Sequence, residues 1–465
     1  MMFRNTQHIH FIGIGGIGMS GMAELLHRLG FKVTGSDCNQ SERTEYLNSL
    51  DVKIAYKHSA KNILNSDVVV YSSAIRFNNV ELLSAKENNI PVIRRAEMLA
   101  ELLKVKETSI AIAGTHGKTT TSSLLGSILT EAKLDPTLVI GGIVNKFNTN
   151  SISGKGDVIV VEADEFDRSF LTLQPTLSII NNLDLEHLDC YKNLNDLQST
   201  FIEFGNKVPF YGTVALGIDS KNIRLIENKI KRPIVTYGLI DDATVKAKKL
   251  VFKQHQTDFD LYYENKKLGT IHLNIPGEHN VINALGAISI ALELDISFEK
   301  IYEGLKLYKG VRRRFEIITV AANNIMVIDD YAHHPSEVNA TINAAKKGWD
   351  RRIVAIFQPH LFSRTRDFYK DFAKSLTNAD LLFITDIYGA REKPIEGISS
   401  KIIVDECKNI GHKNIIYIPK VEEIPNTIID HINPNDIIIT MGAGNIWRQC
   451  EQIIQKINNE STTFR

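Results

Sequence analysis

The chain has 465 residues, and at about 150 residues per domain this length predicts three domains, because single hydrophobic cores stop growing well below this size. Lys plus Arg and Asp plus Glu both number 54, so the net charge is zero and no global positive field favours a nucleic acid as partner. Apolar residues make up 43% and charged residues 23%, which excludes a disordered or collagen-like chain.

The N-terminal segment MMFRNTQHIHFIGIGGIGMSG has neither a basic n-region nor a cleavage site, and no run of 18 apolar residues occurs in the sequence. We therefore expect a cytoplasmic enzyme with no membrane insertion. The four cysteines lie far apart and form no C-x-x-C pair, which predicts reduced thiols and neither a disulfide framework nor a zinc site. They are Cys38, Cys190, Cys407 and Cys450.

The first hundred residues alternate strand-like and helical patterns. HIHFIGIG is strand-like, and Met19, Met22, Leu26 and Leu29 then recur at helical spacing. KVTGSD, VKIAY and DVVVYSS follow as further short strands. This β-α-β order predicts a parallel, doubly wound, Rossmann-like sheet.

The segment Gly13–Gly18 matches G-x-G-x-x-G between a strand and a helix, where the backbone can approach a diphosphate and the helix N-terminus stabilises its charge. Asp37 ends the next strand, where a carboxylate could accept a ribose hydroxyl. The motif predicts a nucleotide diphosphate site, with a purely structural turn as the alternative; NAD and a UDP-sugar require nearly the same contacts. The candidate substrate-binding residues are Gly13, Gly15, Gly16, Ile17, Gly18, Asp37 and Ser73.

A second glycine loop, GTHGKTTT, lies between the strand-like SIAIA and a helical pattern. Its amides would surround the β- and γ-phosphates, Lys118 would neutralise their charge, and a threonine hydroxyl could ligate Mg²⁺. Ile112 stands where the first glycine of G-x-x-x-x-G-K-[ST] belongs, which disfavours a common kinase or GTPase loop. The candidate ATP-binding residues here are Gly114, Thr115, His116, Gly117, Lys118, Thr119 and Thr120.

Acidic residues follow two further strand-like runs. VIVVEADEFD supplies four acids, of which Glu162 is favoured as a metal ligand and the other three as solvated loop charge. In NNLDLEHLDCY, His187 lies among carboxylates, although a lone histidine is more often structural. Oxygen ligands with one imidazole suit Mg²⁺ or Mn²⁺. The candidate metal ligands are Glu162, a hydroxyl of Thr119 or Thr120 and, with a structural role as the favoured alternative, His187.

Residues 244–275 alternate polar and apolar side chains, which predicts appended antiparallel strands with a hairpin turn near Asn265. The following GEHNVINALGAISIALEL is helical in pattern. Asn280 and Asn283 at its start could contact an adenine edge, with N-capping as the competing interpretation.

The last third repeats the strand and helix alternation and predicts another open α/β sheet. Three of its strands end in the polar segments DDYAHHP, QPHLFSRT and DIYGAREK. Open α/β sheets bind ligands at this edge, so we expect an active-site face there. In the preceding run Arg312–Arg314 one arginine could reach a phosphate, or all three could be solvated.

Taken together, these motifs resemble the Mur ligase family. HFIGIGGIGMSG, GTHGKTTT, EADEFD, EHLD, HNVINA, RRRFE, DDYAHHPSEV, FQPHLFSRT, AREKPIEG and GAGNIW occur in the family's order across essentially the whole chain. The resemblance implies three α/β domains. They are a UDP-sugar-binding Rossmann-like domain over 1–106, a central P-loop-type ATP-binding domain over 107–311, and a C-terminal ligase domain over 312–465.

The resemblance further implies ATP-dependent ligation of L-alanine to the lactyl carboxylate of UDP-N-acetylmuramate through an acyl phosphate, in peptidoglycan biosynthesis. The expected partners are these two substrates and ATP, with Mg²⁺ as cofactor and Mn²⁺ able to replace it. We expect a monomer or a weak homodimer. The alternatives are a recycling ligase that joins a murein peptide to the same nucleotide sugar and, from a different class, an NAD-dependent dehydrogenase.

By motif match, the resemblance also assigns residue roles. Asn280, Asn283, Arg314 and Asp330 would join the second glycine loop in binding ATP. Thr119, Glu162 and His187 would serve the metal sites. His333, His360 and Arg364 would line the amino-acid site. The residues implied to be catalytic are Lys118, Glu162, His187, His333 and Arg364.

The sequence departs from the family pattern at several positions. Phe166 stands where a small residue is expected, and Ala332 where glycine is common. Leu361 and Phe362 replace the Arg and Tyr of some relatives. Several sister ligases carry a carbamylated lysine after the metal histidine, but 193–206 contains no lysine, as the resemblance implies for an alanine-adding enzyme.

Overall fold

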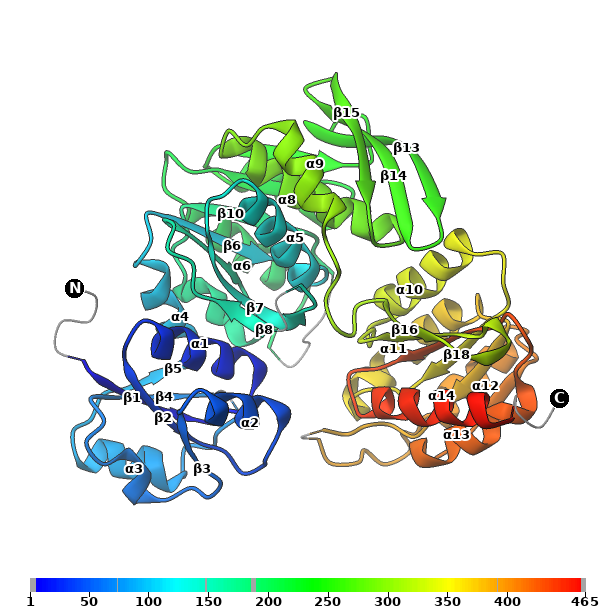
Figure 1. The fold of residues 1–465 in the computed structure, drawn as a ribbon, viewed down its shortest axis with the longest axis horizontal. Helices are drawn as coiled ribbons and strands as arrows, with labels where there is room; N and C mark the ends of the chain where they lie inside the picture. The colour runs from blue at the N-terminus through cyan, green and yellow to red at the C-terminus, as the bar shows by residue number, and fades with distance from the viewer. Residues whose placement is uncertain (1–5, 73, 147–148, 185–189, 391, 461–465) are drawn as a thin grey trace. The chain divides into compact units, whose positions relative to one another are not determined.

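The computed structural model describes residues 6–72, 74–146, 149–184, 190–390 and 392–460. Three sheets follow one another along the chain (Figure 1). The chain divides into two compact units, which are described separately. The first comprises Met1–Lys248, Asp260–Ile271 and Ile282–Lys309, and the second comprises Lys249–Phe259, His272–Val281 and Gly310–Arg465.

The first sheet has five parallel strands in the order β3-β2-β1-β4-β5. Every residue of the central strand β1 is buried, as a parallel strand covered on both faces requires. The prediction of a Rossmann-like sheet is confirmed. Its strands are β1 (His8–Ile12), β2 (Lys32–Ser36), β3 (Lys53–Ala55), β4 (Val68–Tyr71) and β5 (Val92–Arg94). Its helices are α1 (Ile17–Arg28), α2 (Glu42–Ser49), α3 (Val80–Glu87) and α4 (Arg95–Leu103).

The second sheet has ten strands in the order β15-β14-β13-β12-β11-β10-β6-β9-β7-β8. Its parallel part runs from β13 to β7, and β8 pairs antiparallel with β7. The parallel strands are β6 (Thr108–Ala113), β7 (Thr137–Val144), β9 (Val158–Glu162), β10 (Leu177–Ile180), β11 (Val214–Gly217), β12 (Ile234–Gly238) and β13 (Val245–Lys253). The others are β8 (Thr149–Ile152), β14 (Gln256–Tyr263) and β15 (Lys266–Leu273).

Two-residue connections join β13 to β14 and β14 to β15, so these strands are antiparallel, as predicted. The second connection is Glu264–Asn265, and both residues have a positive φ, which two-residue hairpin turns favour. The predicted turn near Asn265 is therefore confirmed. The helices of this region are α5 (Lys118–Glu131), α6 (Leu194–Asn206), α7 (Lys221–Arg224), α8 (Glu278–Glu293) and α9 (Phe298–Lys306).

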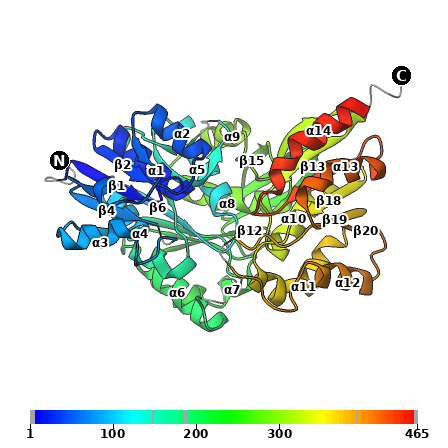
Figure 2. The same ribbon diagram turned by 90° about the horizontal axis from the view of Figure 1, so that it is seen from below.

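The third sheet has the order β16-β17-β21-β18-β19-β20, and only the edge strand β16 runs antiparallel to its neighbour. Separate apolar clusters cover its two faces, with α10, α11 and α12 on one and α13 and α14 on the other (Figure 2). The strands are β16 (Glu316–Val320), β17 (Met326–Asp330), β18 (Ile353–Phe357), β19 (Leu381–Ile384), β20 (Ile415–Tyr417) and β21 (Ile437–Met441). The helices are α10 (Pro335–Gly348), α11 (Phe362–Leu376), α12 (Lys401–Asn409), α13 (Ile424–Thr427) and α14 (Gln449–Glu460).

All four cysteines are free thiols, and Cys407 and Cys450 are buried. Among the described residues, none of the helices combines the length and the apolar character needed to cross a membrane.

Candidate active site

The loop between β1 and α1 is hydrogen-bonded to the end of β2. Gly13, with φ of +79°, and Ile14 donate their amides to the carbonyl of Ser36 at 2.8 and 3.1 Å. The Asp37 carboxylate accepts the Gly15 amide at 2.8 Å, and a side chain on Gly15 would collide with it. Asp37, predicted to meet a ribose, therefore already fixes the shape of the glycine loop.

An arginine that the sequence interpretation did not include lies over this loop. A Cβ on Gly18 would come within 2.8 Å of an Arg95 guanidinium nitrogen. Arg95 is the first residue of α4, and its guanidinium also pairs with Asp164 at 3.2 Å. The loop predicted to bind a diphosphate thus has the Arg95 guanidinium beside it. Ser73, the remaining candidate of this group, is outside the described residues.

The second loop leads from β6 into α5. Gly117 is the N-cap of α5 with φ of +80°, and the Asn283 side chain occupies the place that a Cβ on Gly117 would need. Asn283 also contacts Thr121 at 3.4 Å. Asn283 therefore packs directly against the phosphate loop, as its predicted role requires. The adjacent Thr119 and Thr120 are buried in the first turn of α5.

Hydrogen-bonding partners surround the Lys118 ammonium group. It donates to the carbonyls of Gly114 at 2.6 Å and Thr115 at 3.3 Å, and it pairs with Glu165 at 2.7 Å. Glu165 is 1% exposed, so the interpretation of this residue as solvated loop charge was wrong. Two carboxylates of the acidic segment thus pair with cations: Glu165 with Lys118 and Asp164 with Arg95. Asp167 is exposed, as expected.

The loop is further ordered by residues that follow β10. The His116 amide donates to the Asn182 side chain at 2.8 Å, and the His116 ring lies 3.4 Å from the Asp184 carboxylate. The Thr115 hydroxyl accepts the Asp184 amide at 2.9 Å. These contacts hold the Gly114–Gly117 backbone against the next strand end.

Glu162, at the end of β9, accepts hydrogen bonds from Thr119 at 3.1 Å, Ser122 at 3.3 Å and the Gly141 amide at 2.6 Å. A carboxylate and a hydroxyl so close together are the oxygen donors that Mg²⁺ prefers, so Thr119 and Glu162 fit the predicted metal. His187 lies outside the described residues, and within those residues no group of three His, Cys, Asp or Glu side chains could hold a metal.

Asn280 and its neighbour His279 belong to the second unit. The Asn280 amide donates to the Pro276 carbonyl at 2.7 Å, so its side chain is engaged with the backbone before α8. Burial lowers the pKa of His279 to about 4, opposed by Glu337 and Glu278, and the ring is neutral at pH 7.

Asp330 ends β17 and is almost completely buried. Burial raises the pKa of Asp330 to about 6, against the opposing effect of Arg314 and of two backbone amides. Those amides belong to Phe315 and Ala332, each 2.7 Å from a carboxylate oxygen. Asp330 and Arg314, both assigned to ATP by resemblance, are thus neighbours in the second unit.

The three arginines before β16 differ in their environments. Arg312 is exposed, whereas Arg313 pairs with Asp329 at 2.9 Å and donates to the Gly442 carbonyl at 2.6 Å. Arg314 lies over the Tyr331 ring at 5.1 Å and 3.9 Å from Glu337. The run is therefore not uniformly solvated, since Arg313 and Arg314 both lie against acidic and aromatic side chains.

The residues predicted to bind the amino-acid substrate lie together at the carboxyl edge of the third sheet. The rings of His333 and His360 are 5.8 Å apart, and an Arg364 guanidinium nitrogen lies 3.4 Å from the His360 ring nitrogen. Tyr388, from the third polar strand end, stacks on His360 with ring centroids 6.0 Å apart. The structure thus brings together two histidines, one arginine and a tyrosine from three strand ends.

Comparison with known proteins identifies the family of this chain. Three family models match it in succession: "Mur ligase family, catalytic domain" over residues 8–107, "Mur ligase middle domain" over 112–291 and "Mur ligase, glutamate ligase domain" over 313–444. A UDP-N-acetylmuramate–L-alanine ligase of Trichlorobacter lovleyi is 46% identical over 458 residues, covering 98% of this chain and 100% of the relative. The chain belongs to the Mur ligase family.

Other Mur ligases resemble the chain in both sequence and structure. A UDP-N-acetylmuramate–L-alanine ligase of Geotalea uraniireducens is 47% identical over 99% of this chain and 100% of the relative. The solved structure of the MurC ligase from Thermotoga maritima has a TM-score of 0.83 at 31% identity and covers 98% of this chain and 99% of its own. The solved structure of a murein peptide ligase from Psychrobacter arcticus has a TM-score of 0.71 at 26% identity and covers 97% of this chain and 99% of its own.

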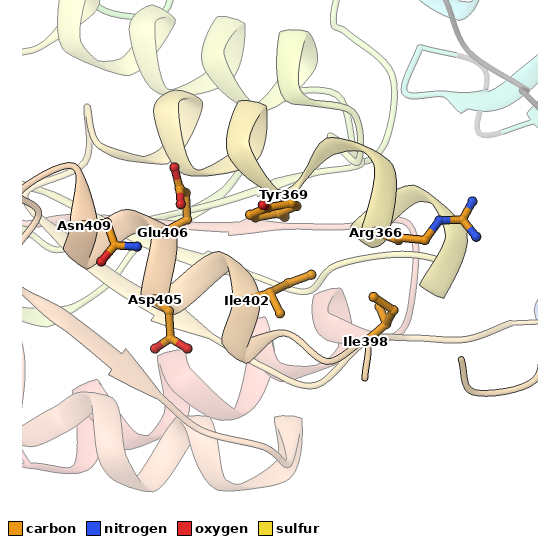
Figure 3. Close-up of a pocket in the computed structure, with 7 residues that line it drawn as sticks. All are labelled: Arg366, Tyr369, Ile398, Ile402, Asp405, Glu406 and Asn409. Carbon is orange, nitrogen blue, oxygen red and sulfur yellow. The ribbon is translucent and has the colours of Figure 1, made fainter. Parts of the chain in front are cut away.

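A pocket of about 400 Å³ lies between α11 and α12, apart from the residues assigned to this Mur ligase's site (Figure 3). Its lining includes Arg366 and Tyr369 of α11 and Ile402 and Asp405 of α12. None of the residues predicted from the sequence lines it. The candidate residues are therefore the glycine loops of the first unit and the strand ends of the second, each considered within its own unit, and not the lining of this pocket.

Proposed function

We propose that this chain joins L-alanine to the lactyl carboxylate of UDP-N-acetylmuramate while ATP is converted to ADP and phosphate, in peptidoglycan biosynthesis. The product would be UDP-N-acetylmuramoyl-L-alanine. The observation that carries the proposal is the presence of two glycine loops in one compact unit. The first, at residues 13–18, is suited to a diphosphate, and the second contains Lys118 and lies beside Glu162. A dehydrogenase would have no use for the loop that contains Lys118.

The chemistry explains why ATP is needed. A carboxylate is a poor acylating agent, because its charge repels nucleophiles. Attack of the lactyl carboxylate oxygen on the γ-phosphorus breaks the bond to ADP and forms an acyl phosphate. The unprotonated alanine amine then attacks the acyl carbon, phosphate leaves with the electron pair of the C–O bond, and the amine loses a proton. Lys118 would stabilise the charge on the transferred phosphoryl group.

Thr119, Glu162 and His187 are the proposed ligands of Mg²⁺, or of Mn²⁺ in its place. The ion would supply charge neutralisation and orientation for the phosphates. The contact between Thr119 and Glu162 at 3.1 Å supports two of these assignments.

The remaining ATP contacts are assigned to Asn280, Asn283, Arg314 and Asp330, and to the amides of residues 114–120. Asn283 has the strongest support, because it packs against Gly117. Arg364 and the two histidines His333 and His360 are proposed to hold the alanine, since a guanidinium is well suited to bind its carboxylate. Their clustering at one sheet edge supports this role.

The diphosphate of UDP-N-acetylmuramate is proposed to bind over residues 13–18, and Asp37 and Ser73 are proposed as further contacts of the UDP-sugar. Arg95 is added here, because its guanidinium lies beside Gly18. The proposed domains are 1–106 for the UDP-sugar, 107–311 for ATP and 312–465 for the amino acid. We propose that the enzyme acts in the cytoplasm as a monomer or a weak homodimer.

The decisive experiment offers the purified chain ATP, Mg²⁺ and UDP-N-acetylmuramate with alanine, glycine, serine or a murein tripeptide. Phosphate release and the product mass are measured for each acceptor. Alanine should give the highest kcat/KM and a product heavier by one alanine residue. Faster turnover with the tripeptide would instead identify the recycling ligase and contradict the proposal.

A further inference from the structure

A hairpin formed by β7 and β8 lies beside α1, the helix that begins in the first glycine loop (Figure 1). The hairpin belongs to the second sheet, in which β7 pairs with β9, whereas α1 belongs to the first. Its contacts reach both candidate phosphate sites, and they are described in turn.

On the side of the first loop, the contact is made by Asn150 of β8. Its side-chain amide donates to the carbonyl of Ile17 at 2.6 Å, and the residue is 1% exposed. Ile17 lies inside the G-x-G-x-x-G segment and is the first residue of α1. Gly21, one turn further along α1, leaves room for Asn150, since a Cβ there would come within 2.9 Å of the amide nitrogen. A central-domain side chain thus fixes the backbone of the first loop.

A buried carboxylate strengthens this attachment. Glu24 of α1 is completely buried and accepts hydrogen bonds from Thr149 at 2.9 Å and Ser151 at 3.0 Å, the two neighbours of Asn150. Within its own domain it pairs with Arg28 at 3.0 Å and Arg43 at 3.4 Å. A buried charge is strongly destabilising once its partners are removed. We therefore expect β8 and α1 to stay in contact.

On the side of the second loop, the contact is made by β7. The Gly141 amide donates to Glu162 at 2.6 Å, and Glu162 in turn accepts the Thr119 hydroxyl at 3.1 Å. A Cβ on Gly141 would lie 2.7 Å from the carboxylate, so glycine permits this close approach. The same hairpin therefore contacts the first loop through Asn150 and the proposed metal ligand through Gly141.

We propose that the β7–β8 hairpin couples the two ligand sites, so that the UDP-sugar and the metal–ATP complex each increase the affinity for the other. Asn150, Ser151 and Glu24 are positioning residues in this proposal and touch neither ligand. A ligand that orders residues 13–18 also orders Ile17, and through it β8, β7 and Glu162. The coupling must be reciprocal, because both affinities belong to one thermodynamic cycle. The inference rests on the proposed function.

The test measures the dissociation constant of UDP-N-acetylmuramate by calorimetry, without and with saturating Mg²⁺ and a non-hydrolysable ATP analogue. The wild-type chain should bind the UDP-sugar about 5-fold or more tightly when the analogue is present. In Asn150→Ala and in Ser151→Ala this ratio should fall below about 2-fold.

Ser127→Ala is the matched control, because Ser127 is also a buried hydroxyl of the central domain but donates to the Gly304 carbonyl of α9 at 2.8 Å and not to Glu24 of α1. It should keep the wild-type ratio. Thermal unfolding of every variant separates a lost coupling from a lost fold. Should Asn150→Ala fail to fold, the milder Ser151→Ala decides the outcome.

A wild-type ratio of one overturns the coupling, as does a folded Asn150→Ala or Ser151→Ala that keeps the wild-type ratio. Either result leaves the proposed function intact if alanine-dependent phosphate release is observed. Failure to bind UDP-N-acetylmuramate at all, together with no such release, would contradict the proposed function itself.

Discussion

The Lys118 ammonium group and the Glu165 carboxylate lie 2.7 Å apart, and the Glu165 side chain is 2% exposed. A phosphate that approaches Lys118 must therefore compete with a buried anion already in place. Removal of that anion should free the lysine for the nucleotide.

For Glu165→Gln we expect tighter binding of the ATP analogue in the absence of Mg²⁺, by about tenfold, or ~1.4 kcal/mol. The reason is that the glutamine amide keeps the shape of the side chain but no longer neutralises Lys118. Fluorescence titration with a labelled analogue measures the change, and Asp167→Asn, an exposed acid of the same segment, serves as control. Unchanged or weaker binding in Glu165→Gln would falsify this account.

For Lys118→Ala we expect the rate of amide formation to fall by about 10³-fold, since one charged donor to a transferring phosphoryl group contributes several kcal/mol. The thermal midpoint should fall as well, because the change removes the ammonium partner of the buried Glu165 carboxylate, so the rate is measured at a temperature where the variant is folded. Coupled assays of ADP release with near-normal turnover would refute the assigned role.

For Arg364→Ala we expect the KM for alanine to rise by about 10- to 100-fold, as the loss of a charged hydrogen bond of 1.5–3 kcal/mol predicts. The KM for ATP should stay within a factor of about two. Arg366→Ala is the matched control, because Arg366 lies on the same helix but lines the pocket between α11 and α12. Initial rates over an alanine series decide the matter, and equal effects in both variants would speak against an alanine site at Arg364.

A pH-dependent contribution to stability is expected from Glu81, a completely buried residue of α3. Burial alone would raise its pKa, but hydrogen bonds from His10, Ser36, Asn62 and Ser59 lower the pKa to about 2. Since the unfolded value is 4.5, ionised Glu81 stabilises the fold above pH 4.5, by roughly 3 kcal/mol, and this stabilisation is lost as the pH falls towards 2.

Urea unfolding of the wild type and of Glu81→Gln from pH 7 to pH 2.5 measures this contribution. The difference in unfolding free energy should be largest above pH 4.5 and should shrink towards pH 2.5. Glu87→Gln, at the exposed end of the same helix, should show no such trend. A difference that is constant with pH would show that Glu81 acts only by packing.

Much of the fold follows from local pattern. The apolar runs around HIHFIGIG, SIAIAG and IMVIDD predict parallel strands because such strands are buried on both faces, and β1, β6 and β17 lie at these places. The hairpin strands β7 and β8 were not predicted. Gly141 and Gly142 interrupt the first, and the sequence TNSI of the second has no apolar alternation. Their stability comes from pairing and from contacts with α1, which a local pattern does not contain.

In the candidate site, too, the features encoded by a local sequence pattern were predicted and those that depend on tertiary packing were not. The glycine loops and polar strand ends were visible because each motif is continuous in sequence. Arg95 was missed, because its place beside Gly18 depends on the packing of α4 against the first loop. The burial of Glu165 was also missed, since EADEFD alone does not reveal which acid turns inward to meet Lys118.

The packing of Asn283 against Gly117 limits how the enzyme could evolve resistance to an inhibitor. One way to weaken a compound seated in the phosphate loop is a substitution at position 117, but a side chain there would collide with Asn283. Shortening Asn283 at the same time would remove the collision but not the strain, because the φ of +80° at Gly117 disfavours most other residues. Position 117 is therefore strongly constrained to glycine, so a change in sensitivity to such a compound has to arise at other positions.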